Sequence, residues 1–437
     1  MPKPSKPTAV AMPEGPCDTL PPGECAALLG IDWGDKEHSI ALLDCGSNKV
    51  EKTTIKHSAE SLHTWLDALI ERFGGHPIAV AVEASRGAIV AALLERPNLL
   101  IYPIHPSSSR RFSMAFSPSG AKDDGPDAAT LLEIIRFHRH KLRLIAPNDE
   151  GSQRLSLLVE ARRTMVDRRT LLCNQLKSLL KNYYPQALEL SGEKLYAPIS
   201  LDFLERWPEL RSLERTKPQT LRDFYHKHQV RRPDKVEKRL ALAASARSLT
   251  SNRALCEVSI IELEVLTAEI RLVQKHIAKT EKAIEQAFAT HPDAYLFENL
   301  PGAGAAMAPR LCVLFGTDRN RWRNAQELQT YYGIAPVTEK SGSKKWVHWR
   351  WNAPVFARQS LVEWAGLSVK ASVWAKAYYK QQEDCQKPHA VIIRSLAFKW
   401  LRILWRCWKD RKQYDEAAYL SSLEQRNPKL FNAIQST

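Results

Sequence analysis

The chain has 437 residues, of which 44% are hydrophobic and 25% charged, a composition typical of globular proteins with two to four domains. Lys and Arg number 63 against 48 Asp and Glu, and the net charge of +15 favours a polyanionic partner such as nucleic acid. No run of about 18 apolar residues occurs, and the eight cysteines include no C-x-x-C pair. This pattern argues against a membrane span, a structural zinc site and a disulfide framework, so we expect a cytoplasmic protein with reduced thiols.

Strand and helix patterns alternate through residues 26–150, which predicts an α/β domain. The preceding segment, 1–25, is rich in proline and lacks an apolar signal core, so we expect a disordered tail there. Apolar runs and helical periodicity predict the following elements: two strands within 26–43, strands at 77–83 and 99–103, and helices at 59–73, 87–95 and 124–138.

Residues 151–290 contain two runs of apolar residues at steps typical of coiled coils, one between Leu158 and Leu180 and one between Leu263 and Ile284. The two helices could pair antiparallel within one chain or between chains. Between them lies a polar insert, 185–251, which is punctuated by proline and whose role the sequence does not give. Arginines crowd the first helix, and two of them, Arg162 and Arg163, could contact phosphates or belong to a solvated face.

The final block, 291–437, opens with a glycine turn, LPGAGAAMAPRL, that contains Gly302 and Gly304. Such a turn is typical of a helix-hairpin-helix whose amides bind phosphate, and equally of a plain connection between two helices. A segment dense in basic residues and tryptophan follows, GIAPVTEKSGSKKWVHWRW. Its tryptophans, which suit either base stacking or one buried face of a strand, are Trp346, Trp349 and Trp351.

Four acids stand at the ends of predicted elements of the first domain. Asp32 and Glu83 each follow an apolar run, while Asp124 and Asp127 lie three apart at a helix start and point to one side. Carboxylates that converge on one rim of a sheet repel one another unless a metal is bound. Two Mg²⁺ ions about 3.5–4 Å apart stabilise the attacking and leaving oxygens of phosphodiester cleavage. Any one of these acids alone is more often a cap or a surface charge, and Asp123 could replace Asp124.

Three segments, GIDWGDKEHSIALLD, AVEASRG and KDDGPDAATLLE, resemble in that order the N-terminal motifs of the DEDD transposases of the insertion-sequence "one-ten" family. LPGAGAAMAPRL and RWRNAQELQTYYGIAPVTEKSGSKK resemble the second domain of the same family. The resemblance covers residues 26–184 and 252–410. It implies a RuvC-like, ribonuclease-H-like mixed-sheet domain, long coiled-coil helices and a mainly helical C-terminal transposase domain. The insert, the N-terminal tail and the stretch KKWVHWRWNAPVFARQ depart from the family pattern.

The resemblance also implies the chemistry. Four acids of the family bind Mg²⁺, two ions with Mn²⁺ as a substitute, and they match Asp32, Glu83, Asp124 and Asp127. A serine in an S-G-S turn is the family's nucleophile, which matches Ser341, and it forms a covalent phosphoserine link to DNA during strand cleavage, exchange and rejoining.

The implied partners are double-stranded donor and target DNA, a noncoding bridge RNA, and further copies of the chain. Family members form dimers and tetramers in which the acids of one subunit act with the serine of another. Such a protein would be associated with a bacterial or archaeal nucleoid. The sequence gives neither the DNA sites, nor the guide RNA sequence, nor the oligomeric state of the free protein.

The residues around Ser341 suit nucleophilic chemistry, although S-G-S-K-K alone is more often a solvated loop. Three lysines, Lys340, Lys344 and Lys345, could stabilise negative charge on a phosphate under attack. Gly342 would let the backbone approach that phosphate, and Ser343 is the nearest rival nucleophile.

Two other functions stay open at this stage. A RuvC-like metal-dependent junction nuclease needs the four acids but no serine. A nucleic-acid-binding scaffold without catalysis needs neither.

Overall fold

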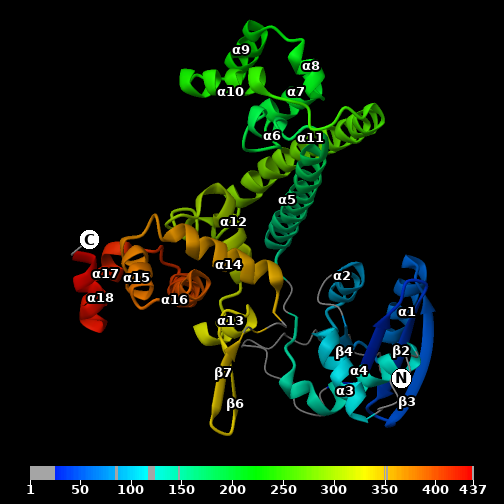
Figure 1. Cartoon of the computed structure of the whole chain (residues 1–437). Helices are drawn as coiled ribbons and strands as arrows, with labels where there is room; N and C mark the ends of the chain where they lie inside the picture. The colour runs from blue at the N-terminus through cyan, green and yellow to red at the C-terminus, as the bar shows by residue number, and fades with distance from the viewer. Residues whose placement is uncertain are drawn as a thin grey trace. The chain divides into compact units, whose positions relative to one another are not determined.

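The computed structural model describes residues 25–83, 87–116, 124–145, 148–348, 350 and 353–435. Two compact units make up the chain (Figure 1): residues 1–149 together with 295–437, and residues 150–294. The first unit contains a mixed α/β domain and a mainly helical C-terminal block, and the described residues of the second are helical. This architecture confirms the expected combination of a mixed sheet with long helices. The predicted tail lies outside the described residues except for Cys25.

A five-stranded sheet with the order β3-β2-β1-β4-β5 forms the centre of the α/β domain. β1 pairs antiparallel with β2, and β2 with β3, whereas β1 pairs parallel with β4, and β4 with β5. The strands predicted within 26–43, at 77–83 and at 99–103 are confirmed. The bounds are β1 (Ala27–Trp33), β2 (Glu37–Asp44), β3 (Lys49–Lys56), β4 (Ile78–Val82) and β5 (Leu99–Pro103).

Each face of the sheet is covered by helices, and side chains alternate between the faces with the period of two that a strand imposes. On β1, Leu29 and Ile31 pack in one core with residues of α1 and α2. Leu28 packs in the opposite core with residues of α4. The helices of the domain are α1 (Ala59–Arg72), α2 (Ala88–Leu94), α3 (Pro106–Phe116), α4 (Asp124–His138) and the 3-10 turn η1 (Arg139–Lys141).

The backbones of α4 and β1 come into close contact at Gly30. A Cβ on Gly30 would clash with the Ala128 carbonyl oxygen and lie 2.6 Å from the Leu132 nitrogen. Only a residue without a side chain fits such an approach. Gly30 therefore fixes how deeply α4 sits on the sheet.

In the second unit, α5 (Glu150–Tyr183) and α11 (Arg253–Ala289) pack as an antiparallel pair within one chain. Arg162, in the first half of α5, forms an ion pair of 2.6 Å with Glu281, near the end of α11. At the start of α5, Ser152 contacts His291, just beyond the end of α11, at 2.8 Å. These contacts show the antiparallel pairing within one chain, and pairing between chains stays a prediction.

The insert is a helical subdomain that shares one core with α5 and α11. Its aromatic residues Phe203, Trp207 and Tyr225 are buried together with Leu176 and Ile270 of the long helices. Proline occupies the first helical turn of three of its helices, where the missing N–H costs no hydrogen bond. The helices are α6 (Ala187–Leu190), α7 (Pro198–Arg206), α8 (Leu210–Glu214), α9 (Pro218–Lys227) and α10 (Pro233–Ser245).

Buried tryptophans hold the C-terminal block together. Trp364, Trp374 and Trp400 are fully buried and lie ring against ring. The indole N–H of Trp400 donates to Ser368 Oγ at 2.8 Å, which satisfies a polar group inside the core. The elements are η2 (Ala294–Leu296), α12 (Gly304–Phe315), α13 (Ala325–Tyr331), β6 (Val337–Ser341), β7 (Lys344–His348), α14 (Val355–Ser368), α15 (Val373–Asp384), α16 (His389–Asp410), α17 (Glu416–Arg426) and α18 (Pro428–Gln435). Among the described residues, no helix is long and apolar enough to cross a membrane.

The substitution Gly30→Ala should lower the free energy of unfolding by about 1–3 kcal/mol or more, because the added methyl group has to displace the α4 backbone. Gly366→Ala is the matched control, since Gly366 lies inside α14 and no neighbouring atom of the described residues is within 4 Å of the place that an added methyl group would take. This variant should be more stable than the wild type by about 0.5–1 kcal/mol. Chemical denaturation of both variants checks this. A Gly30→Ala variant as stable as the wild type would contradict the close packing.

Candidate active site

Asp32 and Glu83 lie side by side at the carboxyl ends of two neighbouring strands. The parallel register pairs Ile31 of β1 with Val82 of β4; Asp32 is the next residue of β1, and Glu83 directly follows the end of β4. Neighbouring strands lie about 4.8 Å apart, so the two backbones are adjacent at this point. The acids are far apart in the sequence, and the sheet topology brings them together.

Both side chains belong to the sheet face that α4 covers. Asp32 follows Leu28 and Gly30 at steps of two, and these two residues contact α4. Glu83 follows Ala79 and Ala81 in the same way, and both alanines belong to the core that includes α4. Asp32 and Glu83 are each half-buried.

The start of α4 lies at the same end of the sheet. Ala128, near the start of the helix, lies against Gly30 in the middle of β1, two residues before Asp32, while Arg139, beyond the end of the helix, contacts Cys25 before β1 at 2.9 Å. Helix and strand therefore run in opposite directions, and Asp127 lies at the end of the sheet where Asp32 stands. We call the set Asp32, Glu83, Asp124 and Asp127 the acid edge.

Two positions of this set are only partly described. Asp124 is the first residue of α4, but its side chain lies outside the described residues, as does the whole of Asp123. The choice between these two acids therefore stays a prediction.

Ser109 is a residue of the site that the sequence analysis missed. Its hydroxyl, on α3, donates a hydrogen bond to the Glu83 carboxylate, and its side chain is buried. One signal was available, because the polar run PSSSRR directly follows the strand that neighbours β4. The bond orients Glu83 at the acid edge.

The acid edge suits a divalent metal ion by donor type, since carboxylate oxygens on one face are what such ions prefer. Among the side chains that the structure describes, no three acids, histidines or cysteines are close enough together to form a metal site. The side chain of Asp124 lies outside the described residues. The described side chains of Asp32, Glu83 and Asp127 thus provide suitable donors for such an ion.

Ser341 is exposed at the tip of a two-stranded hairpin. It ends β6 and pairs with Lys344, the first residue of β7, so Gly342 and Ser343 alone make the turn. Gly342 has a φ of 57°, a left-handed value that glycine adopts without strain and that two-residue hairpin turns require. The hairpin therefore presents the Ser341 hydroxyl on a strand end and Ser343 within the turn.

The register separates the predicted lysines between the two faces of the hairpin. Directly opposed residues share a face, so Lys344 lies beside Ser341 with Cβ atoms about 4.5–5.5 Å apart. Lys340 is paired with Lys345 and lies on the other face; the side chain of Lys345 is not described. Lys344 is thus the lysine whose register places it next to the Ser341 hydroxyl.

Trp346 shares the face of Ser341 but is not buried, with 45% of its surface exposed. Its indole N–H donates to Glu339 at 2.8 Å, and His348 contacts the same carboxylate at 2.7 Å. The hydrogen bonds from His348 and Trp346 lower the pKa of Glu339. The predicted burial of this face is therefore wrong for Trp346, while base stacking by Trp346 stays a prediction. Trp349 and Trp351 lie outside the described residues.

The glycine turn is not a helix-hairpin-helix in the described structure. Only the short 3-10 helix η2 precedes α12, and α11 ends at Ala289. A Cβ on Gly302 would lie 2.9 Å from the carbonyl of Leu367, so Gly302 serves close packing against α14. Gly304 is exposed with a φ of 52°, and phosphate binding there stays a prediction.

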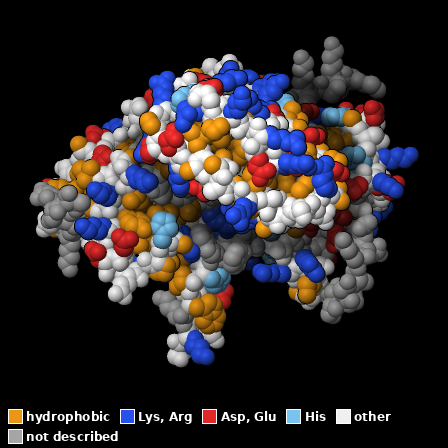
Figure 2. Space-filling view, turned by 45° about the horizontal axis from the view of Figure 1, so that its top comes forward, with side chains coloured by type: hydrophobic (Ala, Val, Ile, Leu, Met, Phe, Trp, Pro, Cys, Tyr) orange, Lys and Arg blue, Asp and Glu red, His pale blue; other side chains and the backbone are white. Residues whose placement is uncertain are grey.

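The two arginines predicted to contact nucleic acid have protein partners. Arg162 pairs with Glu281 at 2.6 Å, and Arg163 pairs with Asp167 one helical turn away at 2.9 Å. Phosphate contact by these arginines is a prediction that the geometry does not favour. On the face drawn in Figure 2, Lys and Arg side chains of the described residues are spread among acidic and apolar ones.

Comparison with known proteins assigns the class. Residues 29–185 match a family model described as "Transposase", and residues 294–380 match one described as "Transposase IS116/IS110/IS902 family". The two matches include the acid edge and the Ser341 hairpin, so both candidate sites lie within transposase domains, and the chain is a transposase, an enzyme that acts on DNA. It belongs to the IS110 family of DEDD transposases.

Related proteins align along most of the chain. It is 28% identical over 402 residues to the "Mini-circle putative transposase for IS117" of Streptomyces coelicolor, an alignment that spans 91% of this chain and 97% of the relative. The "Insertion element IS110 uncharacterized 43.6 kDa protein" of the same organism is 24% identical over 90% of this chain and 96% of its own length. The "Insertion element IS900 uncharacterized 42 kDa protein" of Mycobacterium paratuberculosis is 22% identical over 89% and 97%.

The substitution Ser109→Ala should weaken Mn²⁺ binding at the acid edge by about 10–100-fold, because Glu83 loses the bond that orients it. Titration calorimetry with Mn²⁺ measures this, and raising the metal concentration should restore DNA cleavage. Ser108→Ala is the control, since Ser108 is exposed on the same helix. Unchanged Mn²⁺ affinity in Ser109→Ala, or a loss of cleavage that added metal does not restore, would argue against this positioning role.

Proposed function

We propose that the chain cuts and rejoins DNA by attack of Ser341 on a phosphodiester, assisted by divalent metal at the acid edge. The observation that supports this most strongly is the strand register, which sets Asp32 beside Glu83 at the end of the sheet where α4 begins. Family membership supplies the reaction class, DNA transposition.

The N-terminal domain, 26–150, is proposed to be ribonuclease-H-like, of the RuvC type. Three antiparallel strands followed by two parallel ones, with helices on both faces, support this assignment. The coiled-coil region 151–290, with its insert 185–251, and the C-terminal transposase domain 291–437 complete the proposed organisation.

Each strand-cleavage step begins at the Ser341 hydroxyl. Its Oγ forms a bond to the phosphorus, the proton leaves to solvent, and the bond from phosphorus to a deoxyribose oxygen breaks. That oxygen takes up a proton and becomes a free hydroxyl, while the phosphate stays on Ser341. Rejoining is the reverse attack by a deoxyribose hydroxyl from another strand, so the number of phosphodiester bonds is conserved without an external energy source.

Lys344 and the acid edge act on charge rather than on bonds. Lys344, beside Ser341, would offset negative charge on the phosphate under attack. Asp32, Glu83, Asp124 and Asp127 would hold Mg²⁺, two ions with Mn²⁺ as a substitute. When bound, the metal supplies electrostatic stabilisation of the attacking and leaving oxygens.

The proposed partners follow from the reaction and from the family. Double-stranded donor and target DNA are the substrates, in agreement with the net charge of +15. A noncoding bridge RNA is proposed to select both DNA sites by base pairing. We also propose dimers that join into a tetramer, in which the acid edge of one copy works with the Ser341 of another.

The substitution Ser341→Ala should abolish a denaturation-resistant protein–DNA adduct, because it removes the attacking oxygen. Wild-type protein, the noncoding RNA of the element, labelled DNA with the element ends and Mg²⁺ should give the adduct on a denaturing gel, and peptide mapping should place it on Ser341. Ser343→Ala is the matched control from the same turn and should retain the adduct.

Other outcomes of this experiment would favour the other functions. Full strand cleavage by Ser341→Ala would indicate a junction nuclease that uses the acids alone. An adduct on Ser343 would show that Ser343, and not Ser341, is the nucleophile. An adduct that still forms with Asp32→Asn would show that the acid edge takes no part in the reaction.

A further inference from the structure

A row of polar side chains continues the acid edge across the sheet toward β3. Asp32 of β1 is paired with Ser39 of β2, and Ser39 is paired with Thr54 of β3. Directly paired residues share a face, so Ser39 and Thr54 lie on the α4 face with Asp32 and Glu83. The four side chains span three strand spacings, or about 14 Å.

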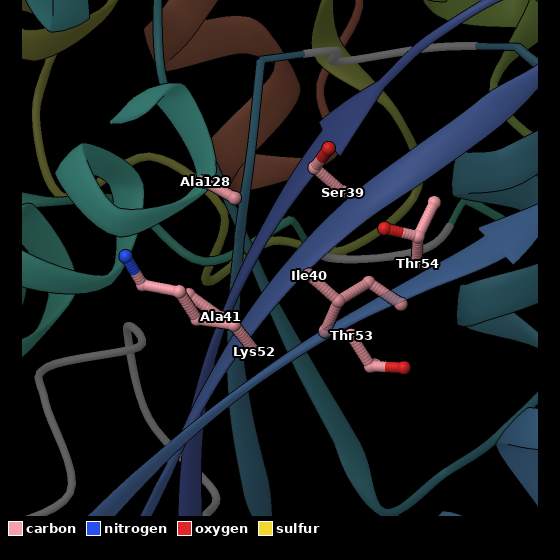
Figure 3. A pocket seen from close by; sticks show the side chains of 7 residues that line it. All are labelled: Ser39, Ile40, Ala41, Lys52, Thr53, Thr54 and Ala128. Carbon is pink, nitrogen blue, oxygen red and sulfur yellow. The ribbon is translucent and has the colours of Figure 1, made fainter. Parts of the chain in front are cut away.

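A depression lies beside this row. It has a volume of about 160 Å³ and is bordered by Ser39, Ala41, Lys52 and Thr54, with Ala128 of α4 on the far side. Figure 3 shows the Lys52 side chain reaching toward the helix that carries Ala128, whereas Thr53 points the opposite way. Two hydroxyl groups and one ammonium group therefore border one hollow next to the acid edge.

The charges on the two faces of β3 differ. On the face of α1 stand Lys49 and Glu51, and Glu51 forms an ion pair with Arg72 at 2.7 Å. On the α4 face stand Lys52, Thr54 and Lys56, and both lysines are exposed. Within the described part of the chain, no carboxylate forms an ion pair with Lys52. The α4 face of β3 is thus cationic, whereas the ends of β1 and β4 on the same face carry the acids of the acid edge.

Lysines on an edge strand also protect against strand pairing between molecules, and β3 is an edge of the sheet. That role does not depend on the face, so it predicts the same importance for Lys49 as for Lys52. Protection of the edge strand also does not explain why the hydroxyl groups of Ser39 and Thr54 lie beside Lys52 in a depression next to the acid edge. The one-sided arrangement favours a ligand with negative charge and several hydrogen-bond acceptors.

We propose that this depression binds a backbone phosphate of the DNA strand that is cut, a short distance along the strand from the scissile phosphate. The inference rests on the proposed function, because the acid edge sets where the strand lies. Ser39 and Thr54 donate hydrogen bonds to phosphate oxygens, and Lys52 neutralises the charge. Since nucleotides repeat about every 3.4 Å along a strand axis, the row of about 14 Å accommodates a few nucleotides.

The test compares Lys52→Gln with Lys49→Gln in the full chain. Lys49 lies on the same strand but the opposite face, so both variants lose one charge and only one alters the depression. Affinity for a fluorescent duplex with one element end is measured over a range of salt concentrations. For Lys52→Gln the slope of log affinity against log salt should become shallower by about 0.9, the effect of one lost phosphate contact. Lys49→Gln should keep the wild-type slope.

A methylphosphonate scan locates the contact. Neutral methylphosphonate at one strand position should weaken wild-type binding and leave Lys52→Gln unaffected, since the variant has already lost that contact. Thr54→Val keeps the charge of Lys52 but loses a hydroxyl donor. This variant should bind DNA more weakly than the wild type, and methylphosphonate at the same strand position should then have a smaller effect on its affinity.

Two results would overturn the inference: equal slopes for Lys52→Gln and Lys49→Gln, or an effect of Lys52→Gln on binding of the noncoding RNA and not of DNA. Failure of the proposed function gives a different result: the wild-type protein would then form no adduct with DNA through Ser341. The salt dependence of DNA binding tests the role of the depression whether or not the Ser341 adduct forms. Unfolding free energies of Lys52→Gln and Lys49→Gln equal to that of the wild type exclude a folding defect.

Discussion

The contact between α4 and β1 at Gly30 is the constraint on which the proposed active site depends. The backbone of α4 lies so close to the strand that no side chain fits between them. Because helix and strand run in opposite directions, this contact sets the start of α4, with Asp127, at the carboxyl end of the strand that leads to Asp32. The parallel pairing with β4 then adds Glu83. A single packing contact thus aligns acids from three separate segments.

The hairpin of β6 and β7 exposes Ser341, the proposed nucleophile, on a short ordered element. Its register sorts the basic residues, placing Lys344 with Ser341 and Lys340 on the other face. The acid edge continues along the sheet into hydroxyl groups and Lys52. In the proposed function, a lysine near each region, Lys344 beside Ser341 and Lys52 beside the acid edge, would offset phosphate charge.

Much of the fold was predictable from local patterns, and the exceptions have physical reasons. Apolar runs predicted four of the five strands, but β3 (KVEKTTIK) is an exposed edge strand with few apolar residues and was missed. The apolar runs predicted α5 and α11, whereas their pairing within one chain depends on contacts such as that of Arg162 with Glu281. For the site, residue types and order suggested the acids, but Ser109 reaches Glu83 only through the fold. Gly302 allows α14 to pack closely, which its neighbours in sequence do not reveal, and phosphate binding at this glycine stays a prediction.

We propose that the metal at the acid edge and the Ser341 hydroxyl act on one phosphodiester. Replacing a non-bridging oxygen of the scissile phosphate by sulfur tests this directly, because Mg²⁺ prefers oxygen ligands and Mn²⁺ accepts softer ones. Joint action on one phosphodiester predicts that sulfur slows formation of the Ser341 adduct in Mg²⁺, that Mn²⁺ restores the rate, and that Asp32→Asn abolishes the recovery. An adduct that forms at the same rate with oxygen or sulfur in both metals would contradict it.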